Sequence, residues 1–378
     1  MRFMIRGILV MTVFIQCTRV LQPPSTIKKM QAEDYVEMGM VAFEKGDWKN
    51  AALSFNKAIK RNPEYAPSYA GMALVLASRD QPEKALEYSD KAIDVNERSP
   101  LVHVIKGRVL TIIKDEDWFD RAIEQYDKAL NLKADNEYAL YYKSSALLEK
   151  GDYEEASELL RHIAEKQGLF QQKARAGLEH VNRLIKAAPQ SQVGYDLVEA
   201  EQITRGDLAA LLSQEIHIIR LLNKRNPHRF ASSQSRSQLS PQDQKRQDAA
   251  ARITDIAGHW AESWIRDVVR VGVMDVYPDY SFRPHEPIRR VNFAMTIQHI
   301  IILITGNTSL DTAYIGSPSI YPDVAPSHYA YNAVHLVSER RILTGDPLTG
   351  EFNLNGTISG LDALLALRAL QNTLPQYF

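Results

Sequence analysis

The sequence has little of what disulfide-bonded proteins, nucleic-acid-binding proteins and the common enzyme classes require. Its 378 residues include one cysteine, so no internal disulfide can form. The 45 basic and 46 acidic side chains nearly cancel, which argues against a nucleic-acid partner. The motifs His-Glu-x-x-His and Gly-x-Ser-x-Gly and a phosphate-binding loop are absent, and the histidines are scattered singly. We therefore expect neither catalysis nor a bound cofactor.

The apolar run at the N-terminus is short. It covers residues 7–15, too few to span a bilayer, and it follows the basic residues Arg2 and Arg6. This order is typical of a secretory signal over residues 1–17. We therefore expect an exported protein.

The single cysteine, Cys17, lies just after this run, where a bacterial lipoprotein would be cleaved and acylated. The segment Phe14-Ile15-Gln16-Cys17 resembles a lipobox, although Gln16 stands where a small residue is expected. The resemblance implies lipidation of Cys17 and a place in the bacterial cell envelope, as an outer-membrane or periplasmic lipoprotein or in association with the wall. Residues 18–31 would then be a short tether. An ordinary signal peptide and an uncleaved anchor are the alternatives.

Small residues recur about every 34 positions in the first half of the chain. Ala51, Ala85, Ala122 and Ala156 are separated by 34, 37 and 34 residues. Such a period is typical of stacked helical hairpins. Small side chains at these positions let the two helices of a hairpin approach closely, whereas larger ones would force them apart.

The unit around Ala51 carries further signals, namely Gly39, the turn Gly46-Asp47-Trp48, Phe55, Ala58 and Pro63. This pattern resembles the tetratricopeptide repeat, which has glycine in its first helix, Ala-x3-aromatic in its second helix and a closing proline. Later units keep part of it, as in Gly107, Ala122-x3-Tyr126 and Gly151-Asp152-Tyr153. The resemblance implies four repeats over residues 32–165 and a capping helix over residues 166–188.

A different motif follows in the second half. Residues 254–261 read Thr-Asp-Ile-Ala-Gly-His-Trp-Ala, and Gly-Val-Met (272–274), Phe-Arg-Pro (282–284) and Ile-Arg-Arg (288–290) come after it. This segment resembles an S-layer homology module. Partial copies lie at 203–207 and from 321 onward. We expect a truncated module at 189–221, a polar, loosely ordered linker at 222–252, a full module at 253–304, a loop at 305–320 and a degenerate module at 321–378.

In the S-layer homology family three modules typically pack as a pseudo-threefold unit whose grooves bind cell-wall polymer. An arginine at a helix start offers a fork of donors to a carboxylate, and a tryptophan offers a flat apolar face to a sugar. The residues that the resemblance implies for this role are Asp255, Trp260, Arg290, Arg205, Asp323 and Tyr329. The alternatives are core packing for the aromatic residues, an ion pair for the arginines and helix capping by the aspartates.

Two features set the third module apart. Gly360 stands where the family has arginine, so we expect its groove to lack an anion-binding side chain. The segment also has the oxygen-ligand spacing of a calcium loop, through Glu351, Asn353, Asn355 and Asp362. Only two of these four are carboxylates, so calcium is the weaker hypothesis, and no other metal site is predicted.

The sequence therefore predicts an all-α protein, in which an N-terminal tetratricopeptide solenoid precedes mostly helical S-layer homology modules with long loops. These resemblances imply a non-enzymatic scaffold that binds a peptidoglycan-linked polymer and, through its repeats, a protein partner. By alignment the partner groove contains Met40, Glu44, Ser78, Arg108, Tyr141, Ser145 and Glu149. The alternative is an accessory lipoprotein of a pilus or export machine, whose S-layer-like modules contact other proteins. A glycan-processing enzyme is a weaker third hypothesis.

Overall fold

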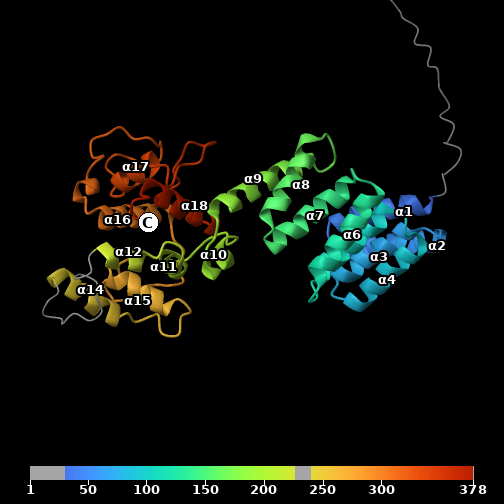
Figure 1. The fold of residues 1–378 in the computed structure, drawn as a ribbon, viewed down its shortest axis with the longest axis horizontal. Coiled ribbons are helices and arrows are strands. Elements are labelled where there is room, and N and C mark those ends of the chain that lie inside the picture. The colour runs from blue at the N-terminus through green and yellow to red at the C-terminus, as the bar shows by residue number, and fades with distance from the viewer. Residues whose placement is uncertain (1–29, 226–239, 378) are drawn as a thin grey trace, which may run out of the picture. The chain divides into compact units, whose positions relative to one another are not determined.

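The computed structural model describes residues 30–225 and 240–377, and within these ranges it contains helices but no strands (Figure 1). The predicted all-α class is thus confirmed. The chain divides into two compact units, Met1–Ala146 and Leu147–Phe378. The predicted secretory signal, Cys17 and most of the predicted tether lie outside the described residues. No helix among the described residues is both long and apolar enough to cross a membrane.

The first unit is a stack of helical hairpins. Its helices are α1 (Ala32–Glu44), α2 (Trp48–Arg61), α3 (Ala66–Ser78), α4 (Pro82–Val95), α5 (Pro100–Ile113), α6 (Trp118–Leu132) and the first part of α7 (Glu137–Lys150). Helices α1 and α2, α3 and α4, and α5 and α6 pack in pairs, and each pair packs on the next. Short polar turns separate them: Gly46 adopts φ +73°, and the side chain of Asp47 accepts from the N–H of Asn50 at the start of α2.

Pairs of a glycine and an aromatic ring set the spacing of these helices. A Cβ on Gly39 would lie 2.6 Å from the ring of Phe55, and one on Gly71 would lie 2.2 Å from the same ring. Gly107 stands in the same relation to Tyr126, at 2.5 Å. The ring of α2 thus fits between α1 and α3 because neither helix has a side chain at the contact. The four alanines of the repeat, Ala51, Ala85, Ala122 and Ala156, are also fully buried, as close packing of the hairpins requires.

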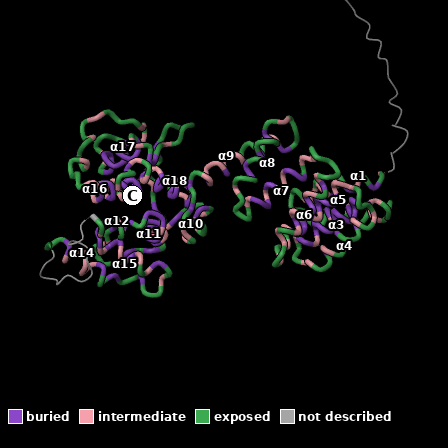
Figure 2. Tube along the Cα trace, viewed as in Figure 1, coloured by how far each residue is buried: buried purple, intermediate pink, exposed green. Residues whose placement is uncertain are grey.

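The second unit begins within α7 and contains eleven further elements of the described chain. These are α8 (Tyr153–Glu165), α9 (Gln171–Ala187), α10 (Gln192–Leu197), α11 (Arg205–Gln214), α12 (Ile218–Arg225), α14 (Pro241–Ala251), α15 (Glu262–Arg270), α16 (Arg290–Thr305), the short 3₁₀-helix η2 (Thr308–Asp311), α17 (Tyr331–Glu339) and α18 (Gly360–Thr373), together with the end of α7. One hydrophobic cluster unites residues from α9 to α18. Figure 2 shows α11, near its centre, as almost entirely buried.

Helix α9 belongs to this cluster although the sequence predicts it as the cap of the solenoid. It packs against α8 on one side and against α18 on the other. Its residues Leu184 and Ala187 are buried in the same core as the C-terminal helices. A cut at residue 188 would therefore remove part of the core of the second unit.

Part of the predicted linker is helical. Helix α14 begins at Pro241, where the side chain of Ser240 accepts from the N–H of Asp243, and it packs against α15 with Ala250 buried. This differs from the expected loosely ordered segment. The polar composition concealed a capped helix that needs only a narrow alanine face to pack.

Candidate functional site

Three backbone segments form a closed cycle at the centre of the second unit. The N–H of Ile288 donates to the carbonyl of Ile203 at 2.9 Å, that of Ile203 to Ile358 at 3.0 Å, and that of Ile358 to Ile288 at 3.2 Å. All three side chains are buried. The cycle links the segments that precede α11, α16 and α18, and so it creates three joints between the three predicted modules.

Arg205 occupies the first joint. It opens α11, and its guanidinium reaches the next module, where Nε donates to the carbonyl of Phe282 at 2.7 Å and Nη2 to that of Asp275 at 2.8 Å. The group also lies 4.7 Å from the centre of the Phe282 ring. Burial lowers the pKa of Arg205 from its ordinary value. Two of its nitrogens therefore stabilise the contact between the modules and are already hydrogen-bonded to backbone carbonyls.

Arg290 occupies the second joint in the same way. It opens α16, and it donates from Nε to the carbonyl of Phe352 at 2.8 Å and from Nη2 to that of Thr344 at 2.6 Å. The guanidinium lies 4.9 Å from the centre of the Phe352 ring. The sequence predicts that both arginines bind an anion. In the structure each of them already donates two hydrogen bonds to backbone carbonyls, so only its other N–H groups can bind a ligand.

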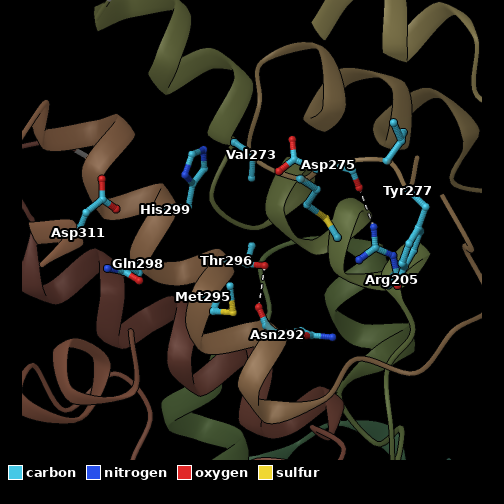
Figure 3. Close-up of a pocket in the computed structure, with 12 residues that line it drawn as sticks. Arg205, Val273, Asp275, Tyr277, Asn292, Met295, Thr296, Gln298, His299 and Asp311 are labelled. Atoms are coloured by element: carbon cyan, nitrogen blue, oxygen red, sulfur yellow. Dashed lines mark hydrogen bonds between the residues drawn. The ribbon is translucent and has the colours of Figure 1, made fainter. Parts of the chain in front are cut away.

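The first and second joints each have a pocket beside the arginine. The first, of about 430 Å³, is lined by Arg205, the loop from Val273 to Tyr277, one face of α16 and Asp311. Figure 3 shows Arg205 next to Tyr277 at one end of this pocket, with His299 and Asp311 at the other. The second, of about 620 Å³, is lined by Arg290, the equivalent loop at 342–347 and α18. The pockets contain both cationic and anionic side chains, so they offer donors and acceptors to a polar ligand.

Asp255 and Asp323 act on the backbone. The carboxylate of Asp255 accepts from the N–H groups of Phe282 and Arg283, both at 2.7 Å. Asp323 accepts from Phe352 at 2.8 Å and from Asn353 at 2.7 Å. Neither caps the helix that follows it. Each of them holds in place the loop whose backbone carbonyl accepts a hydrogen bond from the arginine of the preceding module.

Trp260 and Tyr329 lie at equivalent positions of the two modules and are both open to solvent, at 53% and 71% exposure. Trp260 meets Trp264 edge to face, with ring centres 5.6 Å apart. Tyr329 lies against His328, with ring centres 4.4 Å apart. The alternative of core packing does not hold for either residue.

The third joint has no arginine. A Cβ on Gly360 would lie 1.6 Å from the carbonyl oxygen of Leu197, and the N–H of Gly360 donates to Ala200 at 2.9 Å. Nearby, Arg183 of α9 pairs with Asp362 of α18 at 2.5 Å, and both line the second pocket. Arg183 could not be predicted from the sequence. It lies on α9, outside the predicted modules, where no motif indicates a contact with them.

Two of the four predicted calcium ligands, Asn353 and Asp362, already have partners within the protein. The side chain of Asn353 accepts from the N–H of Gly356 at 3.1 Å, and Asp362 is paired with Arg183. Within residues 30–225 and 240–377 no group of three or more His, Cys, Asp or Glu side chains is placed to hold a metal.

In the first unit, Arg108 is the centre of the predicted partner groove. Its guanidinium pairs with Glu44 at 3.2 Å and lies 4.1 Å from the centre of the Tyr142 ring and 5.6 Å from that of Phe43. Met40, Ser78, Tyr141 and Ser145 are half-buried, and Glu149, in the second unit, is exposed. The alignment missed Tyr142 and Phe43, whose rings hold the arginine.

Comparisons with known proteins find two families that match parts of the chain. The model of the tetratricopeptide repeat matches residues 36–101 and 115–168, and that of the S-layer homology domain matches residues 252–290. A tetratricopeptide repeat-containing protein of Methanocaldococcus jannaschii is 26% identical over 151 residues, which are 40% of this chain and 26% of that protein.

Two further similarities have different coverage. The cellulosome-anchoring protein of Acetivibrio thermocellus is 31% identical over 88 residues, which are 23% of this chain and 18% of that protein. The chain thus spans about a quarter or less of the length of these two relatives. The crystal structure of a tetratricopeptide protein of Thermus thermophilus is 13% identical, with a TM-score of 0.36, and covers 48% of this chain and 91% of its own. The chain carries tetratricopeptide repeats in its N-terminal half and an S-layer homology domain in its C-terminal half.

Proposed function

We propose that this protein is an exported scaffold of the cell envelope that attaches to a cell-wall polymer through its second unit and holds a protein partner on its tetratricopeptide repeats. The observation that carries the proposal is the pair of equivalent pockets beside Arg205 and Arg290 in a three-part ring. The anchoring role named for the relative from Acetivibrio thermocellus supports the same assignment. The protein works by binding, without catalysis.

The pockets suit a glycan with polar substituents. In each pocket the arginine is fixed by two bonds to backbone carbonyls, so its remaining N–H groups are held in place for an acceptor on the ligand. A preorganised donor loses little conformational entropy on binding. Trp260 and Tyr329 add exposed aromatic faces on the modules, each suited to the apolar side of a sugar ring.

The repeats supply the partner-binding face. Arg108 and Glu44 form an ion pair beside the rings of Phe43 and Tyr142, and only the carboxylate side of the pair is largely exposed. This combination of aromatic and charged groups suits an extended peptide or a partner helix. The remaining predicted groove residues of the first unit, Met40, Ser78, Tyr141 and Ser145, would extend this surface.

Membrane attachment is a further part of the proposal. Residues 1–17 would direct export and Cys17 would carry the lipid, with residues 18–31 as the tether. Two or more acyl chains would give stable attachment, since a single chain gives only marginal binding. Replacement of Cys17 by serine should release the protein from membranes while leaving its binding to isolated cell wall unchanged.

The test is co-sedimentation of the full chain with purified peptidoglycan sacculi, before and after acid removal of attached glycans. We expect binding to untreated sacculi only. Arg290→Ala should weaken it, whereas Arg108→Ala, an equally charged change in the first unit, should not. If the chain pellets with intact protein complexes but with neither preparation of sacculi, the accessory-lipoprotein hypothesis replaces this one.

A further inference from the structure

A further pocket, called here the α14 pocket, lies beside the Arg205 pocket, along the helix that the sequence did not predict. It has a volume of about 620 Å³ and lies between α14 and the loop at residues 276–280. Lys245 and Asp248 line it from the helix, Arg252 lines it from the position after the helix, and Tyr277 and Tyr280 line it from the loop. The whole of α14 precedes the segment that matches the S-layer homology family, which begins at residue 252.

Tyr280 has an unusual backbone conformation for its size. Its φ is +61°, in the left-handed region that favours glycine, and 38% of the residue is exposed. The equivalent loop of the third module has Gly350 there, with φ +71°. The two loops are closed by corresponding backbone bonds, from Tyr277 to Ser281 and from Asp346 to Glu351, and the second loop is one residue longer. The fold therefore accepts glycine at this position, and the strained tyrosine points to a use for its ring.

The two pockets adjoin each other. Val276 and Tyr277 line both of them. Tyr277 is held in place, because its hydroxyl donates to Glu286 at 3.0 Å and its ring centre lies 3.7 Å from the guanidinium of Arg283 and 5.2 Å from that of Arg205. A chain-like ligand seated beside Arg205 would pass this fixed ring and reach Tyr280.

The side chains that line the α14 pocket indicate a carbohydrate ligand. Arg252 lies 5.7 Å from the centre of the Tyr280 ring, so an aromatic face and a cation stand together. Gln244 and Asp248 supply an amide and a carboxylate, and Lys245 supplies another cation. Cations and an acid alternate around the aromatic rings, as hydroxyl groups and sugar faces require, whereas a densely anionic polymer would need cations alone.

We propose that this pocket is a second subsite for the cell-wall glycan, in which Tyr280 stacks on a sugar unit adjacent to the unit bound beside Arg205. The inference rests on the proposed function, because the same polymer would occupy both pockets. It adds that the ligand extends beyond the joint and onto α14.

The test compares the full chain with Tyr280→Gly in a titration against sacculi that carry their glycans. Glycine relieves the left-handed strain, so the thermal midpoint should be unchanged or higher. Apparent affinity should nevertheless fall about fivefold through loss of the stacked ring. The control is Tyr195→Ala, which removes another exposed tyrosine, on α10, and should leave affinity unchanged.

The outcomes separate the two proposals. If the parent chain binds and Tyr280→Gly binds equally well, the second subsite is wrong while wall attachment stands. If both Tyr280→Gly and Tyr195→Ala bind less tightly to the same extent, the effect is not local and the subsite is likewise overturned. If the parent chain does not bind sacculi, the proposed function fails and the subsite falls with it.

Discussion

The α-carbon of Gly360 lies so close to the backbone of Leu197 that a Cβ built on it would be 1.6 Å from the Leu197 carbonyl oxygen. At the two other joints of the ring an arginine opens the equivalent helix and reaches across to backbone carbonyls. At this joint the backbone itself fills that place. The arginine expected from the family pattern is absent because no side chain fits there.

Replacing Gly360 with alanine should destabilise the second unit by at least about 2 kcal/mol, because backbone rather than a flexible side chain must move. Fluorescence-detected urea unfolding, with Trp48 and Trp118 changed to phenylalanine, reports the second unit alone. Gly177→Ala is the control: its Cβ would meet only the Leu160 side chain, at 3.3 Å, and we expect a change within about 1 kcal/mol. Equal effects of the two substitutions would contradict this view of the joint.

Arg290→Lys should lower the free energy of unfolding of the second unit by about 1–2 kcal/mol. A lysine ammonium is a point donor on a flexible stem, so it cannot bond the carbonyls of Phe352 and Thr344 as the planar guanidinium does. The neighbouring Arg289→Lys, at an exposed position, should change it by less than about 0.5 kcal/mol. The same urea titration measures both. An Arg290→Lys variant as stable as the parent would show that the joint does not depend on the fork.

Arg368→Met should cost about 3–5 kcal/mol, because it leaves the carboxylate of Glu215 buried without its cation. Arg368 pairs with this fully buried carboxylate and also donates to the carbonyls of Ala187 at 3.0 Å and Ala188 at 2.9 Å. The double variant with Glu215→Leu should lose less than the sum of the two single changes. Strictly additive losses in a double-mutant cycle would mean that the two side chains do not act as a pair.

Stability of the first unit should fall in alkali through Tyr142. Burial raises its pKa to about 12, above the ordinary value of 10, so the unfolded chain releases this proton first. The contribution of Tyr142 is then fully present below pH 10 and is lost as the pH rises toward 12. Tyr142→Phe keeps the ring beside Arg108 but cannot ionise. Urea midpoints at pH 9 and pH 11 should therefore fall more for the parent than for the variant; parallel declines would contradict the assignment.

The all-α class and the hairpins of the first unit could be predicted from the sequence. Gly39 and Phe55, or Gly107 and Tyr126, are close in the chain and meet because one hairpin brings them together. Such contacts follow from a local period, and the period is visible in the residues. Trp260 and Asp255 could likewise be recognised from the sequence, because both belong to one short motif at residues 254–261.

The way in which the second unit closes could not be predicted from the sequence, because it depends on contacts between distant segments. Arg183 meets Asp362, and Arg368 meets Ala187, across about 180 residues of chain. The tertiary structure also decided that Arg205 and Arg290 bind backbone carbonyls, a role without a sequence signature because every residue has a carbonyl. Helix α14 and its pocket were hidden for a related reason, since their few apolar contacts arise from packing between distant segments and leave no periodic trace.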